Sequence, residues 1–164
     1  MNYAQIRKLD ISNGKSVGVS LFVQGCPIHC LNCFNKSTWD PEGGKPWTPE
    51  VEKMFLDLVN REYIKRVSFL GGEPLYGPNL ETIKHLLLEI PNTKTKWIYT
   101  GYKFEDLNRE QQSVVVLADY LVDGPYIDNL KDMKLDFRGS SNQRIIDIQE
   151  SLKTNSIITV EARL

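Results

Sequence analysis

The chain has 164 residues, of which 41% are hydrophobic and 25% charged, a composition ordinary for a soluble globular protein with its own core. Its 20 basic and 21 acidic residues leave a formal net charge of −1, which excludes the broad basic surface that binds nucleic acid or anionic membranes. We therefore expect a single domain over residues 1–164, with neither nucleic acid nor a membrane as partner.

The first predicted element is a strand over residues 16–23, SVGVSLFV, which is apolar and leads directly into a cluster of cysteines. A loop at 43–47 precedes a predicted helix over 48–60, with Thr48 as its N-cap and Pro49 at its first position. The apolar side chains of this helix fall on one face: Val51, Met54, Phe55, Leu58 and Val59.

Strands and helices then alternate along the middle of the chain. A strand over 66–70 ends at the turn GGEP (71–74), and a helix over 79–90 follows, capped by Asn79 and stopped by Pro91. The remaining predictions are a strand at 96–100, a helix at 108–118, a strand at 120–124 and weaker strands at 144–148 and 157–160. This alternation predicts an α/β fold, either a parallel sheet or part of a β/α barrel.

Three loops directly follow strands, and they carry the most unusual residues of the chain. They are the cysteine segment 24–36, the segment 71–76 and the turn TGY at 100–102. Ligands of parallel α/β folds bind at the carboxyl ends of the strands. We therefore expect these three loops to face one pocket.

The uncharged run over residues 16–35 is not a membrane span, because glycines, a proline and polar residues interrupt it. The N-terminus also lacks the charged and then apolar layout of a signal peptide. We therefore expect a reducing, cytoplasmic location, where clustered cysteines more often bind metals or undergo redox chemistry than form disulfides.

All three cysteines of the chain, Cys26, Cys30 and Cys33, lie within eight positions as C-x3-C-x2-C. A structural zinc site normally takes four protein ligands, and full ligation of a [4Fe–4S] cluster takes four cysteines. Three thiolates would leave one iron of such a cluster free to bind a small molecule.

Two other interpretations of the cysteines stay open. Three thiolates with His29, or with the distant His85, would make a zinc site, although we expect His29 to be a loop residue and His85 a surface histidine. A thioredoxin-like pair of Cys30 and Cys33 would leave Cys26 without a role.

The cysteine triad after one strand and GGEP after the next resemble the radical S-adenosylmethionine (SAM) superfamily. The resemblance implies a compact, incomplete β/α barrel with a mostly parallel sheet, in which Cys26, Cys30 and Cys33 hold a [4Fe–4S] cluster. It further implies that the fourth iron binds the amino and carboxylate groups of SAM, whose reductive cleavage produces a 5′-deoxyadenosyl radical.

The same resemblance implies that Gly71, Gly72 and Glu73 bind the methionine end of SAM. Glycines allow close approach of the backbone, and a carboxylate can accept a hydrogen bond from the SAM ammonium. A bulky residue at Gly72 is therefore expected to spare the cluster and weaken SAM binding.

The segment Asn32, Cys33 and Phe34 is implied to lie against the adenine of SAM. It departs from the superfamily pattern, in which the residue before the last cysteine is usually aromatic. Here that residue is Asn32, and the aromatic Phe34 follows Cys33 instead, so we expect backbone groups of Asn32 to Phe34 to meet the adenine.

Five segments indicate which family of the superfamily the chain resembles. They are GCPIHCLNCFNKSTW, GGEPL, YTGY, LVDGPY and FRGSSNQRIID. In this order they resemble the activating proteins of anaerobic, class III ribonucleoside-triphosphate reductases over nearly the whole chain. The resemblance implies that the radical removes hydrogen from a glycine of the large reductase subunit, leaving a glycyl radical. It also implies an electron donor such as reduced flavodoxin.

Several alternatives remain open at this point. One is another small radical SAM enzyme acting on a small molecule, similar to the 7-carboxy-7-deazaguanine synthases, and another is a zinc-binding interaction module. The segment RGSSNQR (138–144) either contacts a protein partner or closes the SAM pocket. Asp123 either faces that pocket or starts a turn with Gly124.

Overall fold

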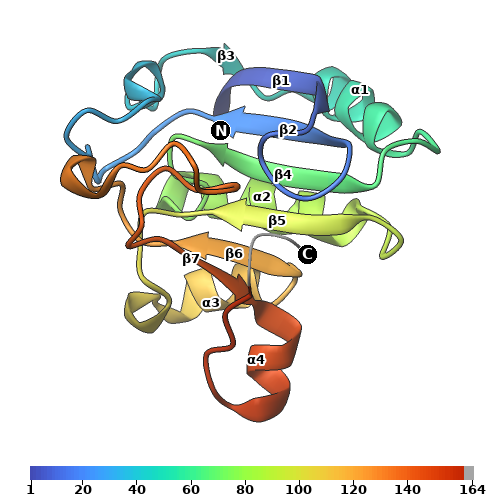
Figure 1. Ribbon diagram of the computed structural model, residues 1–164. Coiled ribbons are helices and arrows are strands. Elements are labelled where there is room, and N and C mark those ends of the chain that lie inside the picture. The colour runs from blue at the N-terminus through green and yellow to red at the C-terminus, as the bar shows by residue number, and fades with distance from the viewer. Residues whose placement is uncertain (161–164) are drawn as a thin grey trace.

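The computed structural model describes residues 1–160, which form one seven-stranded sheet with helices against it (Figure 1). The strand order is β3-β1-β2-β4-β5-β6-β7, so the sheet is open, with β3 and β7 at its edges. The α/β prediction is confirmed, and the sheet does not close into a barrel. The strands are β1 (Asn2–Asp10), β2 (Gly18–Val23), β3 (Lys45–Pro46), β4 (Arg66–Gly71), β5 (Thr95–Tyr99), β6 (Tyr120–Asp123) and β7 (Arg144–Asp147).

The four central strands, β2, β4, β5 and β6, are parallel, and antiparallel pairings flank them on both sides. In this register Val23 of β2 lies opposite Gly71 of β4, and Tyr99 of β5 lies opposite Val122 of β6. The loops that follow these strands therefore leave the sheet at the same edge, as the sequence predicts.

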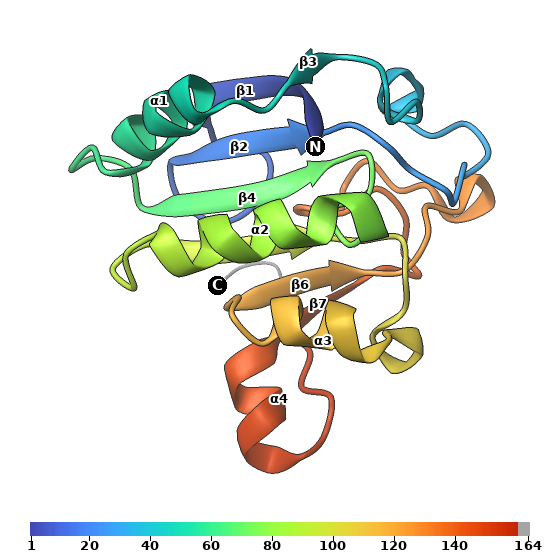
Figure 2. The ribbon, with the colours of Figure 1, turned by 180° about the vertical axis from the view of Figure 1, so that it is seen from behind.

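Helices cover only one face of the sheet. Figure 2 shows α1, α2 and α3 on that face, whereas α4 extends beyond β7. The predicted cap of α1 is confirmed, because the Thr48 side chain accepts a hydrogen bond from the Val51 amide at 3.2 Å. The helices are α1 (Pro49–Val59), α2 (Gly77–Glu89), α3 (Arg109–Val115) and α4 (Ile148–Thr154), with short 3₁₀ turns at Lys36–Thr38, Phe104–Asp106 and Asp128–Leu130.

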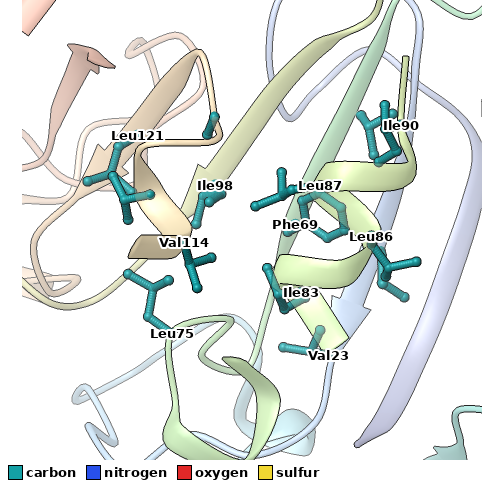
Figure 3. Packing of buried hydrophobic residues seen from close by; sticks show 14 of the residues in the cluster. Val23, Phe69, Leu75, Ile83, Leu86, Leu87, Ile90, Ile98, Val114 and Leu121 are labelled. Atoms are coloured by element: carbon teal, nitrogen blue, oxygen red, sulfur yellow. The ribbon is translucent and has the colours of Figure 1, made fainter. Parts of the chain in front are cut away.

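The main hydrophobic core lies between these helices and the sheet (Figure 3). From α2, Ile83 and Leu87 pack towards Phe69 of β4 and Ile98 of β5, and all four side chains are fully buried. Each such side chain contributes about 1.5–3 kcal/mol relative to an exposed position. This packing makes the carboxyl ends of the parallel strands a rigid platform.

Loops rather than helices lie over the opposite face (Figure 1). The buried side chain of Arg66 joins that face to the loop over residues 11–17, since its guanidinium donates to the carbonyl oxygens of Asp10 and Asn13. The Asp10 carboxylate, 4.0 Å away, balances its charge. A buried cation is tolerated only with such partners, so this cluster holds the loop against the sheet.

Four elements differ from the sequence-based expectations, the first being the short strand β3, which lies within the predicted loop at 43–47. Strand β1 was not predicted, because only Tyr3 and Asp10 along it are buried and its hydrogen-bond partners come from β2 and β3. Helix α4 was not predicted either, since it buries little besides Ile148 and Ser151. The weaker candidate at 157–160 joins β7 through a single bridge and is not a strand. Within residues 1–160, no helix is long and apolar enough to cross a membrane.

Candidate functional site

A cavity of about 610 Å³ lies at the carboxyl ends of the parallel strands. All three predicted loops contribute to its wall, which confirms the expectation of a shared pocket. Seven of the eight predicted site residues line it, and Asn32 does not. The lining residues from these loops are Cys26, Ile28, Cys30, Cys33, Phe34, Asn35, Gly71, Gly72, Glu73, Thr100 and Gly101.

Asn32 does not line the cavity and is exposed. Its side-chain amide donates to an Asp128 carboxylate oxygen at 2.9 Å, which ties the cysteine loop to the segment after β6. The neighbouring Phe34 does line the cavity, and its ring packs against Tyr126 with centroids 5.0 Å apart. The aromatic surface near the last cysteine thus comes from Phe34.

Backbone hydrogen bonds close the cysteine loop at its base. The Gly25 amide donates to the Thr38 carbonyl at 2.7 Å, and the Cys26 amide donates to the Trp39 carbonyl at 3.0 Å. Between these anchors the chain turns sharply, with His29 and Asn32 in the left-handed region at φ of 52° and 57°. The three thiols are therefore presented by a tightly wound loop whose ends are fixed.

The thiols themselves fit a cluster with one open corner. All three are free and partly buried, and burial raises the pKa of Cys26 and of Cys30. Bound iron would offset this cost, because metal ligation requires the thiolate form. Three cysteines on the wall of one cavity match a [4Fe–4S] cluster that keeps one iron for a ligand.

A single zinc ion fits this loop less well. Tetrahedral coordination with ordinary Zn–S bonds requires sulfur atoms about 3.8 Å apart. In residues 1–160, no three His, Cys, Asp or Glu side chains are gathered closely enough to hold one metal ion. His29 instead stacks on Trp39, with ring centroids 4.3 Å apart. His85 is a surface residue, as expected, and lies 3.3 Å from Glu52 on the helical face.

Glu73 connects two of the three loops. Its carboxylate accepts hydrogen bonds from the Thr100 hydroxyl at 2.8 Å, the Gly101 amide at 2.8 Å and the Leu75 amide at 2.9 Å. Burial raises the pKa of Glu73 to about 7, although these three donors oppose the shift. A carboxylate has about four acceptor positions, so one remains for a cationic donor of a ligand in the cavity.

The two glycines before Glu73 are required by the packing of the backbone. A Cβ atom at Gly72 would lie 2.6 Å from the Gly25 carbonyl oxygen, and one at Gly71 would lie 2.7 Å from the Phe22 Cα. Gly71 also has a φ of +105°. Because its missing side chain faces the base of the cysteine loop, the structure leads us to expect that a bulky residue at Gly72 disturbs the cluster as well as SAM binding, whereas the sequence-based expectation spares the cluster.

Asn79 was predicted to cap α2, and this prediction is wrong. The helix already begins at Gly77, since Pro78 suits its first turn. The buried side chain of Asn79 instead donates to the carbonyl oxygens of Gln24 and Glu73, each at 3.0 Å. It therefore fixes the end of β2 against the GGEP turn, a positioning role that no local sequence signal indicates.

Comparison with known proteins identifies the family. A family model described as a 4Fe-4S single cluster domain matches residues 12–146. The chain is 42% identical over 149 residues to the anaerobic ribonucleoside-triphosphate reductase-activating protein of Escherichia coli (strain K12), covering 87% of this chain and 96% of that protein. The proteins of the same name from Enterobacteria phage T4 and Vibrio cholerae serotype O1 are 38% and 37% identical, covering 88% of this chain and 93% and 97% of theirs.

The chain belongs to the family of anaerobic ribonucleoside-triphosphate reductase-activating proteins. Membership in the reductase-activating family confirms the resemblance seen in the sequence, and the matching family model supports the predicted [4Fe–4S] cluster. The zinc module and the deazaguanine synthase-like enzyme gain no support from these matches.

The segment RGSSNQR forms part of the cavity wall. Arg138, Gly139 and Gln143 line the cavity. The Gln143 side chain holds the segment in place, since it accepts from the Gly139 amide at 2.9 Å and donates to the Gly124 carbonyl at 3.1 Å. Of the two roles left open for this segment, the structure supports closure of the pocket.

Asp123 does not line the cavity and has a structural role. Its buried carboxylate accepts from the Arg144 guanidinium at 3.0 and 2.5 Å and from the Phe104 amide at 2.8 Å. We expect Asp123→Ala to lower the free energy of unfolding by about 2 kcal/mol, because it removes the acceptor of the Arg144 Nε–H and of the part-buried Phe104 amide. Urea denaturation measures this loss.

The matched control is Glu105→Ala. Glu105 contacts the same guanidinium at 2.9 Å, but its side chain is 48% exposed. Its removal should cost less than about 1 kcal/mol, because water screens an exposed ion pair. Equal losses in the two variants would contradict the structural role assigned to Asp123.

Proposed function

We propose that this protein activates an anaerobic ribonucleoside-triphosphate reductase by creating a glycyl radical on the reductase large subunit. The observation that carries the proposal is the single cavity shared by three free thiols, the GGEP turn and the TGY turn in a member of the reductase-activating family. When bound, the [4Fe–4S] cluster and SAM would supply a 5′-deoxyadenosyl radical able to remove the α-hydrogen of a glycine.

Different residues of the chain would bind the [4Fe–4S] cluster and SAM. Cys26, Cys30 and Cys33 would each ligate one iron, which leaves the fourth for the methionine end of SAM. Glu73 would accept a hydrogen bond from the SAM ammonium with its remaining acceptor position. The Phe34 ring offers an apolar surface for the adenine, whereas Asn32 would contribute only backbone groups because Asp128 occupies its side chain.

We further propose that residues 1–164 act as one radical SAM domain, whose open sheet is a shortened form of the β/α barrel. A sheet without closure leaves a face accessible to a protein segment, as a macromolecular substrate requires. The protein would act in the cytoplasm, where a small carrier such as reduced flavodoxin would supply the electron.

The proposed function is tested by mixing the anaerobically reconstituted protein with an anaerobic reductase, SAM and dithionite. We expect an electron paramagnetic resonance doublet on the reductase, because hydrogen removal from glycine leaves an unpaired electron at its α-carbon. Omission of SAM is the control and should give no doublet. A protein that releases 5′-deoxyadenosine but leaves no radical on the reductase would contradict the proposal.

A further inference from the structure

The side chain of Asp128 joins the cysteine loop to the segment that follows β6. Its Oδ2 accepts a hydrogen bond from the Asn32 side-chain amide at 2.9 Å, and its Oδ1 accepts one from the Tyr126 hydroxyl, also at 2.9 Å. These two hydrogen bonds lower the pKa of Asp128, so the group is a charged carboxylate at neutral pH. Hydrogen bonds to a charged acceptor are stronger than those between neutral groups.

Both donors are close to groups that line the cavity. Asn32 directly precedes Cys33 and Phe34 in the chain. The Tyr126 ring packs against Phe34 with centroids 5.0 Å apart, and both rings line the cavity. Burial raises the pKa of the Cys30 thiol, and a hydrogen bond from the Tyr126 backbone opposes that shift, which places Tyr126 against a second cysteine. One carboxylate thus holds two parts of the cavity wall near the cysteines.

The turn that contains Asn32 depends on this contact for its place in the molecule. Asn32 has a φ of 57°, a left-handed conformation that asparagine tolerates better than most residues. Within the turn, the Cys33 amide donates to the Cys30 carbonyl at 3.1 Å, which shapes the turn but does not tie it to the sheet. The Asn32 side chain bonds instead to a residue 96 positions away. That bond therefore orients the turn relative to the opposite wall of the cavity.

The segment that carries Asp128 is itself anchored. The Ile127 amide donates to the hydroxyl of the fully buried Ser140 at 3.2 Å. The Ser141 amide donates to the Leu130 carbonyl at 2.9 Å, on the other side of the 3₁₀ turn that Asp128 begins. The carboxylate therefore has a fixed position from which it can orient the cysteine loop.

The contact between Asn32 and Asp128 is too exposed to matter much for folding. Asn32 is exposed, Asp128 is only partly buried, and neither belongs to the hydrophobic core. Water competes for such a contact, so its loss changes stability little. Groups that contact a ligand, in contrast, must be held within about 0.5 Å of their productive positions. The contact is therefore better suited to positioning than to stabilising the chain.

We propose that Asp128 is a positioning residue for SAM, which acts through Asn32 and Tyr126 to hold the segment from Asn32 to Phe34 against the adenine. This assignment rests on the proposed function, because it concerns the adenine side of the same cavity. The chain lacks an aromatic residue before its last cysteine, and this long-range contact takes the place of such an anchor.

The test exchanges the two groups of the contact in the reconstituted full-length protein. Asn32→Asp places two carboxylates opposite each other, and their repulsion should raise the Kd for SAM about tenfold. Adding Asp128→Asn restores the contact with its roles reversed, because the new amide donates to the new carboxylate and its oxygen still accepts from Tyr126. This double variant should bind SAM within about twofold of the wild-type Kd. Equilibrium dialysis measures the Kd, and the KM for SAM should change in parallel while kcat is retained.

The matched control combines Asn32→Asp with Asp136→Asn. Asp136 lies on the same segment as Asp128, but it is exposed and does not line the cavity. This control has the same net charge as the exchanged pair, yet no donor faces the new carboxylate. It should bind SAM as weakly as Asn32→Asp alone. All three variants should keep the wild-type iron content and melting temperature.

Three results would overturn the assignment. Wild-type affinity for SAM in Asn32→Asp would show that the contact does not position the adenine side of the cavity. Equal affinities in the two double variants would show that Asn32 and Asp128 do not act as a pair. Loss of iron or a lower melting temperature in Asn32→Asp would assign the contact to the cluster or to the fold.

Failure of the proposed function gives a different result. A wild-type protein that binds SAM, with the expected affinities in the variants, but leaves no radical on the reductase would contradict the proposed function and support the role of Asp128. A reconstituted wild-type protein that does not bind SAM would contradict both.

Discussion

Replacing Cys26, Cys30 or Cys33 by serine should abolish cluster assembly and reductase activation while the sheet stays folded. The thiols lie in a partly exposed loop, form no disulfide and are not members of the hydrophobic core. Reconstituted wild-type protein should contain about four irons and four sulfides per chain, as a cubane requires. Each serine variant should lose most of both, with little change in its melting temperature.

His29→Ala is the control for this experiment. His29 lies between two of the cysteines in the sequence, but its ring stacks on Trp39. The His29→Ala variant should therefore keep the iron content, the sulfide content and the activity of the wild-type protein. If the wild-type protein instead contained one zinc per chain and no acid-labile sulfide, and His29→Ala lost that zinc, the site would be a zinc site of three cysteines and one histidine.

Gly72→Ala should have the next largest effect. Its Cβ would lie 2.6 Å from the Gly25 carbonyl oxygen, 2.9 Å from that of Thr38 and 3.0 Å from that of Val23. These atoms are backbone and cannot rotate away, so the chain must shift at a cost of about 3 kcal/mol. For a domain of this size, that loss lowers the melting temperature by roughly 6–12 °C.

Gly72→Ala should also impair cluster assembly, because Gly25 and Thr38 form the base of the cysteine loop. Gly77→Ala is the matched control, since among residues 1–160 no atom outside its own helical turn lies within 4 Å of the added Cβ. Within the first turn of α2 this change should leave stability unaltered or raise it by about 0.5–1 kcal/mol. A Gly72→Ala protein with wild-type melting temperature and iron content, but weak SAM binding, would contradict this expectation.

The cysteine replacements and Gly72→Ala test different parts of the cluster-binding site. The cysteines supply the ligands, and the glycines let the strand ends come close enough for the ligands to face the cavity. Cysteine variants should therefore lose the cluster but keep the fold, whereas Gly72→Ala should weaken both. Melting temperature and iron content, measured on the same samples, separate these cases.

Much of this organisation is local and was predictable. Thr48 and Pro49 start α1 as expected, because a cap depends on neighbours within one turn. The central strands were found because they are nearly continuous apolar runs, as strands buried on both faces are. In contrast, β1 carries several exposed charges and depends on pairing with β2 and β3, which no local pattern specifies.

The sequence by itself determined the chemistry of this protein: three thiols at fixed spacing, a glycine-rich turn and an acidic residue after successive strands. Only the tertiary structure decided how these groups are used. In the folded chain the Asn79 side chain joins the end of β2 to the GGEP turn instead of capping α2, Gly72 packs against the cysteine loop, and Asn32 bonds to Asp128 and does not line the cavity. The physical reason is that ligand type depends on residue identity and short spacing, whereas burial and hydrogen-bond partners depend on segments far apart in the chain.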